Sequence, residues 1–554
     1  MFEAMLLLLC LLSCVNSQEV EFKDWKPYES KVVIPQVIDL RSGGSIDMMM
    51  GAMTHTWGAG MELPVDMYGY KLVDDDSATV PTYPGPTILV SKNVPVEVTW
   101  INNISAPHLL DRYIARQLLM PPSACYPLCG VPLITHVHGL EVPAKYDGVP
   151  NQAIYTSQSK KDVYTNRQMS STHAYHDHAM GLTRLNHWAG LVGGYIIEDS
   201  EVESARGIVV SFDIPLLLSD TLVSTEGVLM YTKNPCETTS THWAPESYGN
   251  VNAVNGVVMP IVEVPRAEAV ELRLINGANS RGYGLDIPFF RSCSIIGKDM
   301  ALLNTPVPLT SPDEIVFFPL ERVDLFCNFS EIEEGSVYNV TNTLYPEGTE
   351  QLFTEVFQLK IVASSATLLG MKDPVVGSEA STVGRSRKPR DADSLNHIKD
   401  LAALHESTGG RVRNIALEEV TNEEDCPVKL LIKVENQTST FENHNYVSCH
   451  KGKVEKWVFT NPTADVHPFH WHAISVQCGP TEAEINSNEL KDTVQIPSAE
   501  EDYETVVQVC YVACVPNAFL EEGSTVGPTE FDFSTEDPYV FHCHIMPHGN
   551  KSSF

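Results

Sequence analysis

Hydrophobic residues along the chain fall into short runs rich in Val, Ile, Phe and Tyr, separated by residues such as Gly, Pro, Asn and Asp. Runs of this length between turn-forming residues predict β-strands, and no long stretch has the 3.6-residue period of an amphipathic helix. The pattern therefore predicts an all-β protein, and the spacing of the runs is typical of Greek-key β-sandwiches. Examples of the expected strands are residues 94–101, 193–198, 208–213, 270–276, 315–326, 357–362, 429–434, 454–459 and 505–512.

The hydrophobic pattern stops in one long stretch. Residues 377–414 are mostly small, charged or turn-forming, which predicts a linker or mobile loop. A basic cluster in it, from Arg385 to Arg390, has two interpretations, a processing site or an ordinary solvated part of the linker. A second boundary is expected near Ser200, after the strand expected at 193–198. A length of 554 residues predicts two to four domains, and the two boundaries divide the chain into three, at 18–200, 201–376 and 415–554.

The N-terminal segment predicts secretion. Met5 to Cys14 form a short apolar run and small residues around Ser17 offer a cleavage point, so residues 1–17 are interpreted as a signal peptide. No later segment approaches eighteen apolar residues, so the mature protein is expected to be secreted and to have no membrane partner. Sequons agree with an extracellular glycoprotein; they begin at Asn103, Asn328, Asn339, Asn436 and Asn550.

Charge narrows the set of partners. The chain has 37 Lys and Arg against 71 Asp and Glu, and a net charge of -34 repels phosphate backbones and attracts cations. We therefore expect no nucleic-acid partner. Acidity of this kind also keeps an extracellular protein soluble, so it does not by itself indicate a substrate.

The cysteine count is odd in the mature chain. Of the 13 cysteines, Cys10 and Cys14 belong to the predicted signal peptide and eleven remain. In an oxidising compartment this implies one thiol outside disulfide chemistry and up to five bridges among the other ten. We expect Cys543 to be that thiol, because it alone lies between two histidines. The close pairs Cys125/Cys129 and Cys510/Cys514 have metal-like spacings, but disulfides are favoured in a secreted chain.

Four short motifs contain ten of the 19 histidines. On a β-strand the side chains of residues i and i+2 point to the same face, so a His-X-His pair presents two imidazoles side by side to metal ions. One such pair is often only a hydrogen-bonded surface feature, but four together predict eight imidazoles converging on one place. The motifs are His136-Val137-His138, His176-Asp177-His178, His467-Pro468-Phe469-His470-Trp471-His472, and His542-Cys543-His544 followed by His548.

The triplet His542-Cys543-His544 has a further property. On a strand, Cys543 faces the side opposite to both flanking histidines, so one strand can serve two metal sites. A cysteine thiolate with two imidazoles is the ligand set of a blue copper electron-transfer centre, and His467 and His548 remain to complete it.

These motifs, in this order, resemble the four copper-binding signatures of the multicopper oxidases. Residues 176–186 and 189–193 are similar in particular to the laccase and bilirubin oxidase branch that includes bacterial spore-coat laccases, and so are residues 81–87 and 254–256. The similarity runs in patches from about residue 80 to 330 and from 450 to the end. The resemblance implies three cupredoxin-like Greek-key β-sandwich domains.

The resemblance also implies four copper ions and assigns their ligands by motif. His136 and His470 would hold a type 2 copper, and His467, Cys543 and His548 a type 1 copper. Cys543 would pass single electrons through its backbone to the histidines beside it. The remaining motif histidines would hold a coupled type 3 pair: His138, His176, His178, His472, His542 and His544.

The activity implied by the resemblance is oxidation of a small-molecule reducing substrate coupled to four-electron reduction of O2 to water. The substrate would be a phenol, an aromatic amine or a tetrapyrrole. Two alternatives stay open: oxidation of Fe(II) or Cu(I), or a copper-binding secreted protein with impaired oxidase activity.

Reduction of O2 also consumes protons, so an ionisable group is expected beside the trinuclear centre. Asp147 is our candidate, because it follows the first histidine pair where the resemblance places an acidic residue that assists proton delivery. Asp147-Gly148 is also an ordinary turn sequence, and that interpretation stays open.

The C-terminus departs from the family pattern. Relatives carry an axial Met, Leu or Phe ten residues beyond the cysteine, whereas position 553 is Ser. Two explanations stay open: an axial position without a strong ligand, shielded by Phe554, or an incomplete sequence.

Overall fold

The protein is seen here as a computed structural model. It describes residues 25–58, 60, 63–73, 80–116, 119, 121–232, 244–344, 353–363, 375–376, 398–421, 427–435, 437–439, 453–499, 506–514 and 539–547. Several predictions from the sequence fall outside these ranges: the signal peptide at 1–17, the basic cluster at 385–390, the type 1 ligand His548, the axial position Ser553, and the sequons at Asn436 and Asn550.

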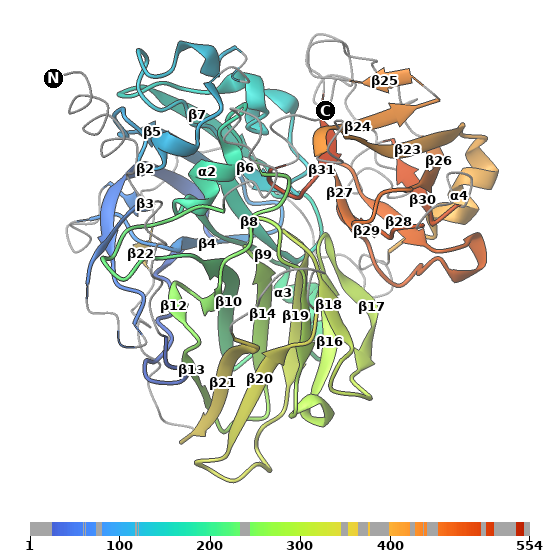
Figure 1. The fold of residues 1–554 in the computed structure, drawn as a ribbon. Coiled ribbons are helices and arrows are strands. Elements are labelled where there is room, and N and C mark those ends of the chain that lie inside the picture. The colour runs from blue at the N-terminus through green and yellow to red at the C-terminus, as the bar shows by residue number, and fades with distance from the viewer. Residues whose placement is uncertain are drawn as a thin grey trace, which may run out of the picture.

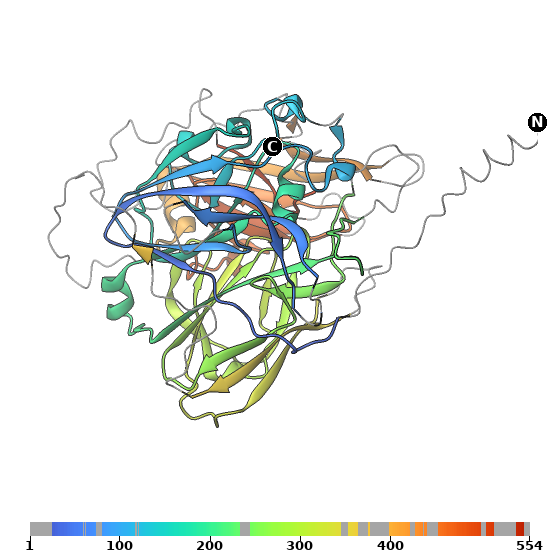
Figure 2. The ribbon, with the colours of Figure 1, turned by 90° about the vertical axis from the view of Figure 1, so that its left-hand side faces the viewer.

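The strands form six sheets, and these pack into three β-sandwiches that follow one another along the chain (Figure 1). The prediction of an all-β fold is confirmed. Each sandwich has its own buried apolar cluster between its two sheets, as alternating strand faces require. Figure 2 shows the same three colour groups from the side, with the green and yellow sandwich below the other two.

The first sandwich consists of a six-stranded and a four-stranded sheet around Trp100, Tyr70 and Tyr175. The larger sheet has the order β22 (Val375–Val376), β1 (Val37–Leu40), β4 (Gly85–Ser91), β9 (Val192–Glu198), β8 (Ser171–Asp177) and β6 (Thr135–His138). The smaller has the order β3 (Val65–Leu72), β2 (Gly44–His55), β5 (Val96–Asn102) and β7 (Ser159–Tyr164).

The second sandwich pairs a seven-stranded with a five-stranded sheet. The first has the order β12 (Val257–Val258), β11 (Val251–Val254), β10 (Phe212–Thr221), β14 (Val270–Asn276), β19 (Arg322–Cys327), β16 (Cys293–Lys298) and β17 (Ala301–Pro308). The second has the order β13 (Ile261–Pro265), β21 (Glu355–Val362), β20 (Val337–Asn342), β15 (Tyr283–Asp286) and β18 (Ile315–Phe317).

The third sandwich packs a six-stranded sheet on a three-stranded one. The larger has the order β25 (Gln437–Ser439), β24 (Pro427–Val434), β23 (Val412–Thr421), β26 (Val454–Thr460), β30 (Gln508–Ala513) and β28 (Val476–Gly479). The smaller has the order β29 (Thr493–Ile496), β27 (His467–Trp471) and β31 (Phe541–Cys543).

Helices in the described part of the chain are short. The α-helices are α2 (Thr183–Trp188), α3 (Ser200–Ala205) and α4 (Leu401–Thr408). The 3-10 turns are η1 (Asp111–Tyr113), η3 (Ser123–Cys125), η4 (Ala144–Tyr146), η5 (Pro150–Gln152), η6 (Phe290–Ser292) and η8 (Glu482–Glu484). None of the helices in these ranges is long and apolar enough to cross a membrane.

Most of the expected strands are present, and two differ in extent. The run at 315–326 forms two strands, β18 and β19, because the chain turns between them at Leu320, whose φ is +63°. The run at 208–213 contributes only its end, since β10 begins at Phe212 and continues to Thr221.

The C-terminal part of the predicted linker is ordered, which corrects the prediction for these residues. Within 377–414, residues 401–408 form α4, whose N-cap Asp400 accepts a hydrogen bond from Ala403 N. Leu401 and Ile398 are buried against Val454 and Tyr511 of the third sandwich, and this burial explains the order. The domain division at 377–414 itself stays a prediction.

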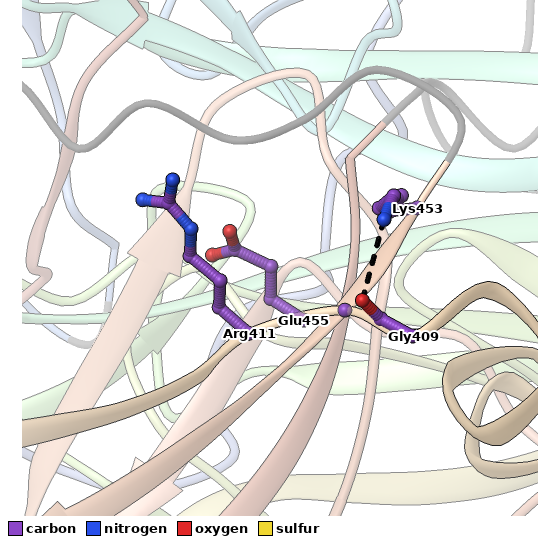
Figure 3. Close-up of a pocket in the computed structure, with 5 residues that line it drawn as sticks. Gly409, Arg411, Lys453 and Glu455 are labelled. Carbon is purple, nitrogen blue, oxygen red and sulfur yellow. Dashed lines mark hydrogen bonds between the residues drawn. The ribbon is translucent and has the colours of Figure 1, made fainter.

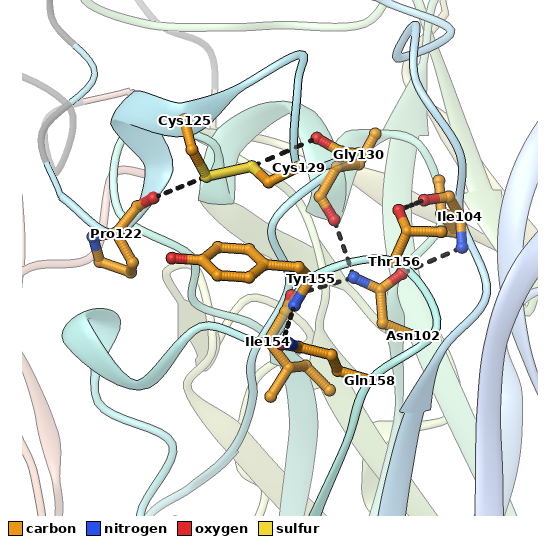
Figure 4. The surroundings of a disulfide bond; sticks show 11 residues. Asn102, Ile104, Pro122, Cys125, Cys129, Gly130, Ile154, Tyr155, Thr156 and Gln158 are labelled. Carbon is orange, nitrogen blue, oxygen red and sulfur yellow. Dashed lines mark hydrogen bonds between the residues drawn. A yellow bond between two sulfur atoms is a disulfide. The ribbon is translucent and has the colours of Figure 1, made fainter.

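Three disulfides are formed within the described residues: Cys125–Cys129, Cys293–Cys327 and Cys478–Cys510. Cys514 is also in a disulfide, so Cys510 and Cys514 are not joined to each other. The Cys125–Cys129 bridge closes a small loop after η3 (Figure 4). Cys129 O accepts a hydrogen bond from Thr156 N. Among the described cysteines, Cys543 alone is outside the disulfides, as predicted. Cys236, Cys426 and Cys449 lie outside the described residues.

Candidate metal centre

Two adjacent strands of the first sandwich carry the first two histidine motifs. β6 and β8 are antiparallel, and their register places His136 opposite His176, with ring centroids 5.6 Å apart. His138 ends β6, and His178 follows the end of β8. All four imidazoles are buried.

The third sandwich supplies the other two motifs through β27 and β31. Their antiparallel register pairs Phe469 with Cys543 and His470 with His542. Opposed residues share a face and neighbours alternate, so His467 falls on the side of Cys543, and His470 on the side of His542. His467 Nδ1 accordingly lies 3.3 Å from Cys543 Sγ.

Eight imidazoles from the two sandwiches meet between them. The rings of His136 and His472 stack with centroids 4.0 Å apart, and those of His138 and His470 stack at 3.7 Å. Two further contacts across the junction join His178 with His542 at 5.0 Å and His176 with His544 at 5.3 Å. In Figure 1, β6, β8, β27 and β31 lie where the blue-green and red parts of the molecule approach each other.

Hydrogen bonds on the outside of this cluster determine which nitrogen of each ring faces inward. Nδ1 of His136, His176 and His470 donates to the main-chain oxygens of Asp147, Asp177 and Asp492, at 2.5, 2.8 and 2.9 Å. A neutral imidazole that donates from Nδ1 has a lone pair on Nε2. The Nε2 atoms of these three rings have no hydrogen-bond partner among the described residues.

The Nε2 atoms of His472, His542 and His178 form a second group, which also indicates a bound cation. Nδ1 of His472 donates to Asp147 Oδ2 at 2.8 Å, and Nδ1 of His542 donates to Cys543 O at 3.0 Å. Their Nε2 lone pairs then face each other at 3.3 Å, and His178 Nε2 lies 3.3 Å from both. Opposed lone pairs repel unless a cation lies between them, and metal-bound histidines characteristically donate their other N–H outward as these do. The residues therefore fit bound metal ions.

The protonation state of the cluster agrees with this. Burial, together with the neighbouring imidazoles, lowers the pKa of His176, His178, His472 and His544 well below the ordinary value. The same effects lower the pKa of His542 to about 3. The rings are therefore neutral near pH 7, which is the form that binds metals.

Comparison with known proteins identifies the metal. Two family models described as multicopper oxidase match residues 130–202 and 413–509, which contain three of the four histidine motifs. The chain is 27% identical over 545 residues to Multicopper oxidase LPR1 homolog 1 of Oryza sativa, covering 92% of this chain and 87% of the relative. It is 28% identical over 491 residues to the laccase of Bacillus subtilis, covering 84% and 86%.

Residues 130–202 and 413–509 thus match multicopper oxidase models, and most of the chain is similar to multicopper oxidases and laccases. The protein is a copper oxidoreductase that uses O2, and the family's cofactor set is one type 1 copper, one type 2 copper and a type 3 pair.

Solved structures support the cupredoxin-domain fold of this chain. The bacterial laccase-like multicopper oxidase CueO from Ochrobactrum sp. has a TM-score of 0.66 at 19% identity, with 94% of this chain and 98% of that chain covered. McoA from Aquifex aeolicus has a TM-score of 0.63 at 20% identity, with 96% and 100% covered.

In this structure, Asp147 lies beside two of the candidate ligands. Its side chain is 2.8 Å from His472 Nδ1 and 3.4 Å from His136 Nδ1, and it is fully buried. It also occupies a turn, because Gly148 has a φ of +71° and packs too closely on Thr135 O to admit a side chain. The structure thus brings Asp147 to the cluster, while its proposed role in proton delivery stays a prediction.

Around Cys543, acidic groups gather that the sequence analysis did not single out. Burial raises the pKa of the Cys543 thiol, and the negative charges of Asp465 and Glu246 raise it further. Burial, Asp465 and Glu246 also raise the pKa of Glu419 to about 7. A cation bound at Cys543 opposes all of these shifts.

Asp492 was also missed. It immediately precedes β29 and contacts His138 and His470, although 354 residues separate it from His138. The local sequence marks Asp492 only as a residue between a polar loop and a short apolar run. The register between β27 and β29 brings it to the cluster.

A separate small cavity lies at the end of α4, lined by Gly409, Gly410, Arg411, Lys453 and Glu455. Lys453 Nζ donates to Gly409 O at 3.3 Å within it (Figure 3). None of its lining residues belongs to the histidine cluster, so it has no part in the metal centre.

Proposed function

We propose that this protein is a secreted laccase-like oxidase whose type 1 copper is held by His467, Cys543 and His548. The observation that carries the proposal is the register of β27 and β31, which turns Cys543 toward His467 and His542 toward the imidazole cluster. One tripeptide thus links the two sites through covalent bonds, a short route for electrons.

We assign the eight clustered histidines as the ligands of the other three coppers. His136 and His470 hold the type 2 ion, and the type 3 pair is held by His138, His176, His178, His472, His542 and His544. When bound, the copper ions supply the redox chemistry that stores four electrons and delivers them to O2. The inward-facing nitrogens and the outward hydrogen bonds of these rings support the assignment.

Asp147 is the candidate for supplying protons. Its carboxylate accepts a hydrogen bond from His472 and lies beside His136. It therefore contacts one candidate ligand from the first sandwich and one from the third. A buried carboxylate in this position can hold a proton near the place where O2 is reduced.

For the reducing substrate, two classes have support. The resemblance to laccases favours a phenol, an aromatic amine or a tetrapyrrole. The acidic groups Asp465 and Glu246, whose charges act on Cys543, favour a metal cation, Fe(II) or Cu(I). A neighbour in fold, with a TM-score of 0.60 at 13% identity, is a Campylobacter jejuni multicopper oxidase described as a metallo-oxidase.

Secretion and the domain division belong to the same proposal. The three disulfides support an oxidising compartment. The three separate apolar cores support domains at 18–200, 201–376 and 415–554.

Oxygen uptake by the copper-loaded protein tests the function. We expect uptake with an aromatic donor or with Fe(II), and we expect Cys543→Ser to abolish it and the blue colour while retaining trinuclear copper. Absence of uptake with every donor class from a fully loaded protein would leave only the copper-binding alternative.

A further inference from the structure

Asp492 contacts one histidine in each of two His-X-His pairs, His138 in the first sandwich and His470 in the third. Its Oδ1 lies 2.9 Å from His138 Nε2, and its main-chain oxygen lies 2.9 Å from His470 Nδ1. The next residue repeats the arrangement: Thr493 Oγ1 lies 2.8 Å from His138 Nε2 and 3.2 Å from His470 Nδ1. Two consecutive residues therefore contact the outer edges of two rings that stack 3.7 Å apart.

Asp492 contacts His138 through Nε2, whereas it contacts the stacked ring of His470 through Nδ1. A carboxylate only accepts hydrogen bonds, so His138 donates from Nε2 and its lone pair is on Nδ1. Nδ1 of His138 has no hydrogen-bond partner among the described residues, and neither has Nε2 of His470. Asp492 thus fixes opposite tautomers on the two stacked rings, so that each presents a lone pair away from the carboxylate.

Arg322 of the second sandwich keeps the carboxylate in place. Its two terminal nitrogens donate to the two oxygens of Asp492 at 2.8 and 2.6 Å, and its Nε donates to Thr172 O of β8 at 2.9 Å. Arg322 and Asp492 are both almost fully buried. Because the guanidinium donates to both carboxylate oxygens, these oxygens act as hydrogen-bond acceptors on this side of the rings and not as ligands of a further metal ion.

The contact joins all three sandwiches at one point. Thr172 belongs to the first, Arg322 to the second and Asp492 to the third. The candidate ligands themselves come only from the first and third sandwiches. The second sandwich therefore reaches the metal centre through Arg322 and Asp492.

We propose that Asp492, held by Arg322, is a positioning residue that fixes the orientation and tautomers of His138 and His470 for copper binding. This inference rests on the proposed function, because it takes these two histidines as ligands of the trinuclear centre. Removing a partner of this kind behind a metal ligand typically weakens metal binding 10- to 100-fold.

The test is copper retention by Asp492→Asn in the full chain. After copper loading, the variant and the wild type are treated with a chelator, and the copper per chain and the type 2 EPR signal are followed over time. We expect trinuclear copper to leave at least tenfold faster from Asp492→Asn, with the type 1 blue absorption unchanged. Because Asp492 Oδ1 also lies 3.6 Å from Nδ1 of the type 2 ligand His470, we expect the type 2 hyperfine pattern to change, which a general loss of stability does not produce.

Asp324→Asn is the matched control. Asp324 is buried in the same junction, accepts a hydrogen bond from Thr172 Oγ1 at 2.7 Å and lies 3.6 Å from Arg273. These contacts are with neighbours of the cluster and not with the candidate ligands, so we expect its copper retention to equal that of the wild type. If Asp492→Asn does not fold, Thr493→Val and Arg322→Lys test the same support by removing a neighbouring donor or the two-point contact.

Equal copper retention and an unchanged type 2 signal in Asp492→Asn, or in both substitute variants, would overturn the inference. Faster loss from Asp324→Asn as well would also overturn it, because the effect would then belong to the junction and not to the ligand contact. Failure of the wild-type protein to bind four coppers would instead contradict the proposed function.

Discussion

Cys543 Sγ lies 3.3 Å from His467 Nδ1 across the strand pair β27–β31, while the histidine that precedes Cys543 faces the other way. The relationship follows from strand alternation, since consecutive residues of β31 point to opposite faces. A thiolate held at one site is thereby bonded through its own backbone to a ligand of a second site.

If Cys543 binds copper, its thiolate should not be in a disulfide in the isolated protein. We expect mass mapping of the unreduced protein to find Cys543 outside every disulfide, with the other ten mature cysteines paired, because a thiolate bound to copper cannot also form a bridge. Within the described residues Cys543 forms no disulfide. Its recovery in a disulfide-linked peptide would exclude the type 1 assignment.

Asp147→Asn removes a carboxylate that contacts the candidate ligand His472, and it leaves every candidate copper ligand in place. We expect the type 1 colour to persist and reoxidation of the reduced protein by O2 to slow roughly 100-fold, since a positioned acid or base contributes on that order. Stopped-flow measurement of reoxidation across pH checks this. Unchanged rates at every pH would leave Asp147 with only its role in the turn.

The acidic groups beside Cys543 predict how substrate classes separate. Burial raises the pKa of Glu246 to about 7, so it is charged above that pH. There we expect Glu246→Gln to raise the KM for Fe(II) about tenfold, because loss of one nearby unit charge costs on the order of 1 kcal/mol or more. The KM for a neutral aromatic donor should change little. Glu203→Gln, which removes an acidic group at α3, is the control. Equal KM values for Fe(II) in Glu246→Gln and wild type would count against cation binding at this position.

Asp162 on β7 predicts a pH-dependent stability. Burial raises its pKa to about 6 despite the opposing charge of Lys160, so ionisation in the folded state is unfavourable. Wild-type stability is therefore lost as pH rises from about 4 to about 6. Asp162→Asn removes this loss, and we expect it to gain about 2 to 3 kcal/mol relative to wild type over that window.

Thermal unfolding of both proteins at pH 4.5 and 7.5 checks this prediction. The difference in Tm should favour Asp162→Asn more strongly at pH 7.5 than at pH 4.5. A difference that does not depend on pH would show that ionisation of Asp162 does not oppose folding.

Sequence patterns predicted what depends on local periodicity. The strand expected at 270–276 is β14 with the same bounds, because alternation along seven residues is a local property. The expected strand 315–326 is two strands, since the turn at Leu320 interrupts a run that remains hydrophobic. Burial of Leu401 against another sheet, which orders part of the predicted linker, depends on contacts that composition does not contain.

The candidate site divides in the same way. Motif spacing predicted that pairs of histidines share a face, and the structure brings His136, His176 and the other described motif histidines together. Asp492 and Arg322 could not be predicted, because they reach His138 through a junction of three sandwiches. Nothing in the local sequence of either residue marks that contact.

Metal analysis of the copper-loaded protein tests the central claim most directly. We predict four copper ions per chain, because the eight clustered imidazoles and the Cys543 site together supply the ligands of one type 1, one type 2 and two type 3 ions. His176→Gln should lose trinuclear copper and keep the blue absorption. His405→Gln, in a histidine outside the four motifs that bonds Val454 O, should keep all four. A single copper per wild-type chain, or zinc retained at these positions after copper loading, would contradict the account.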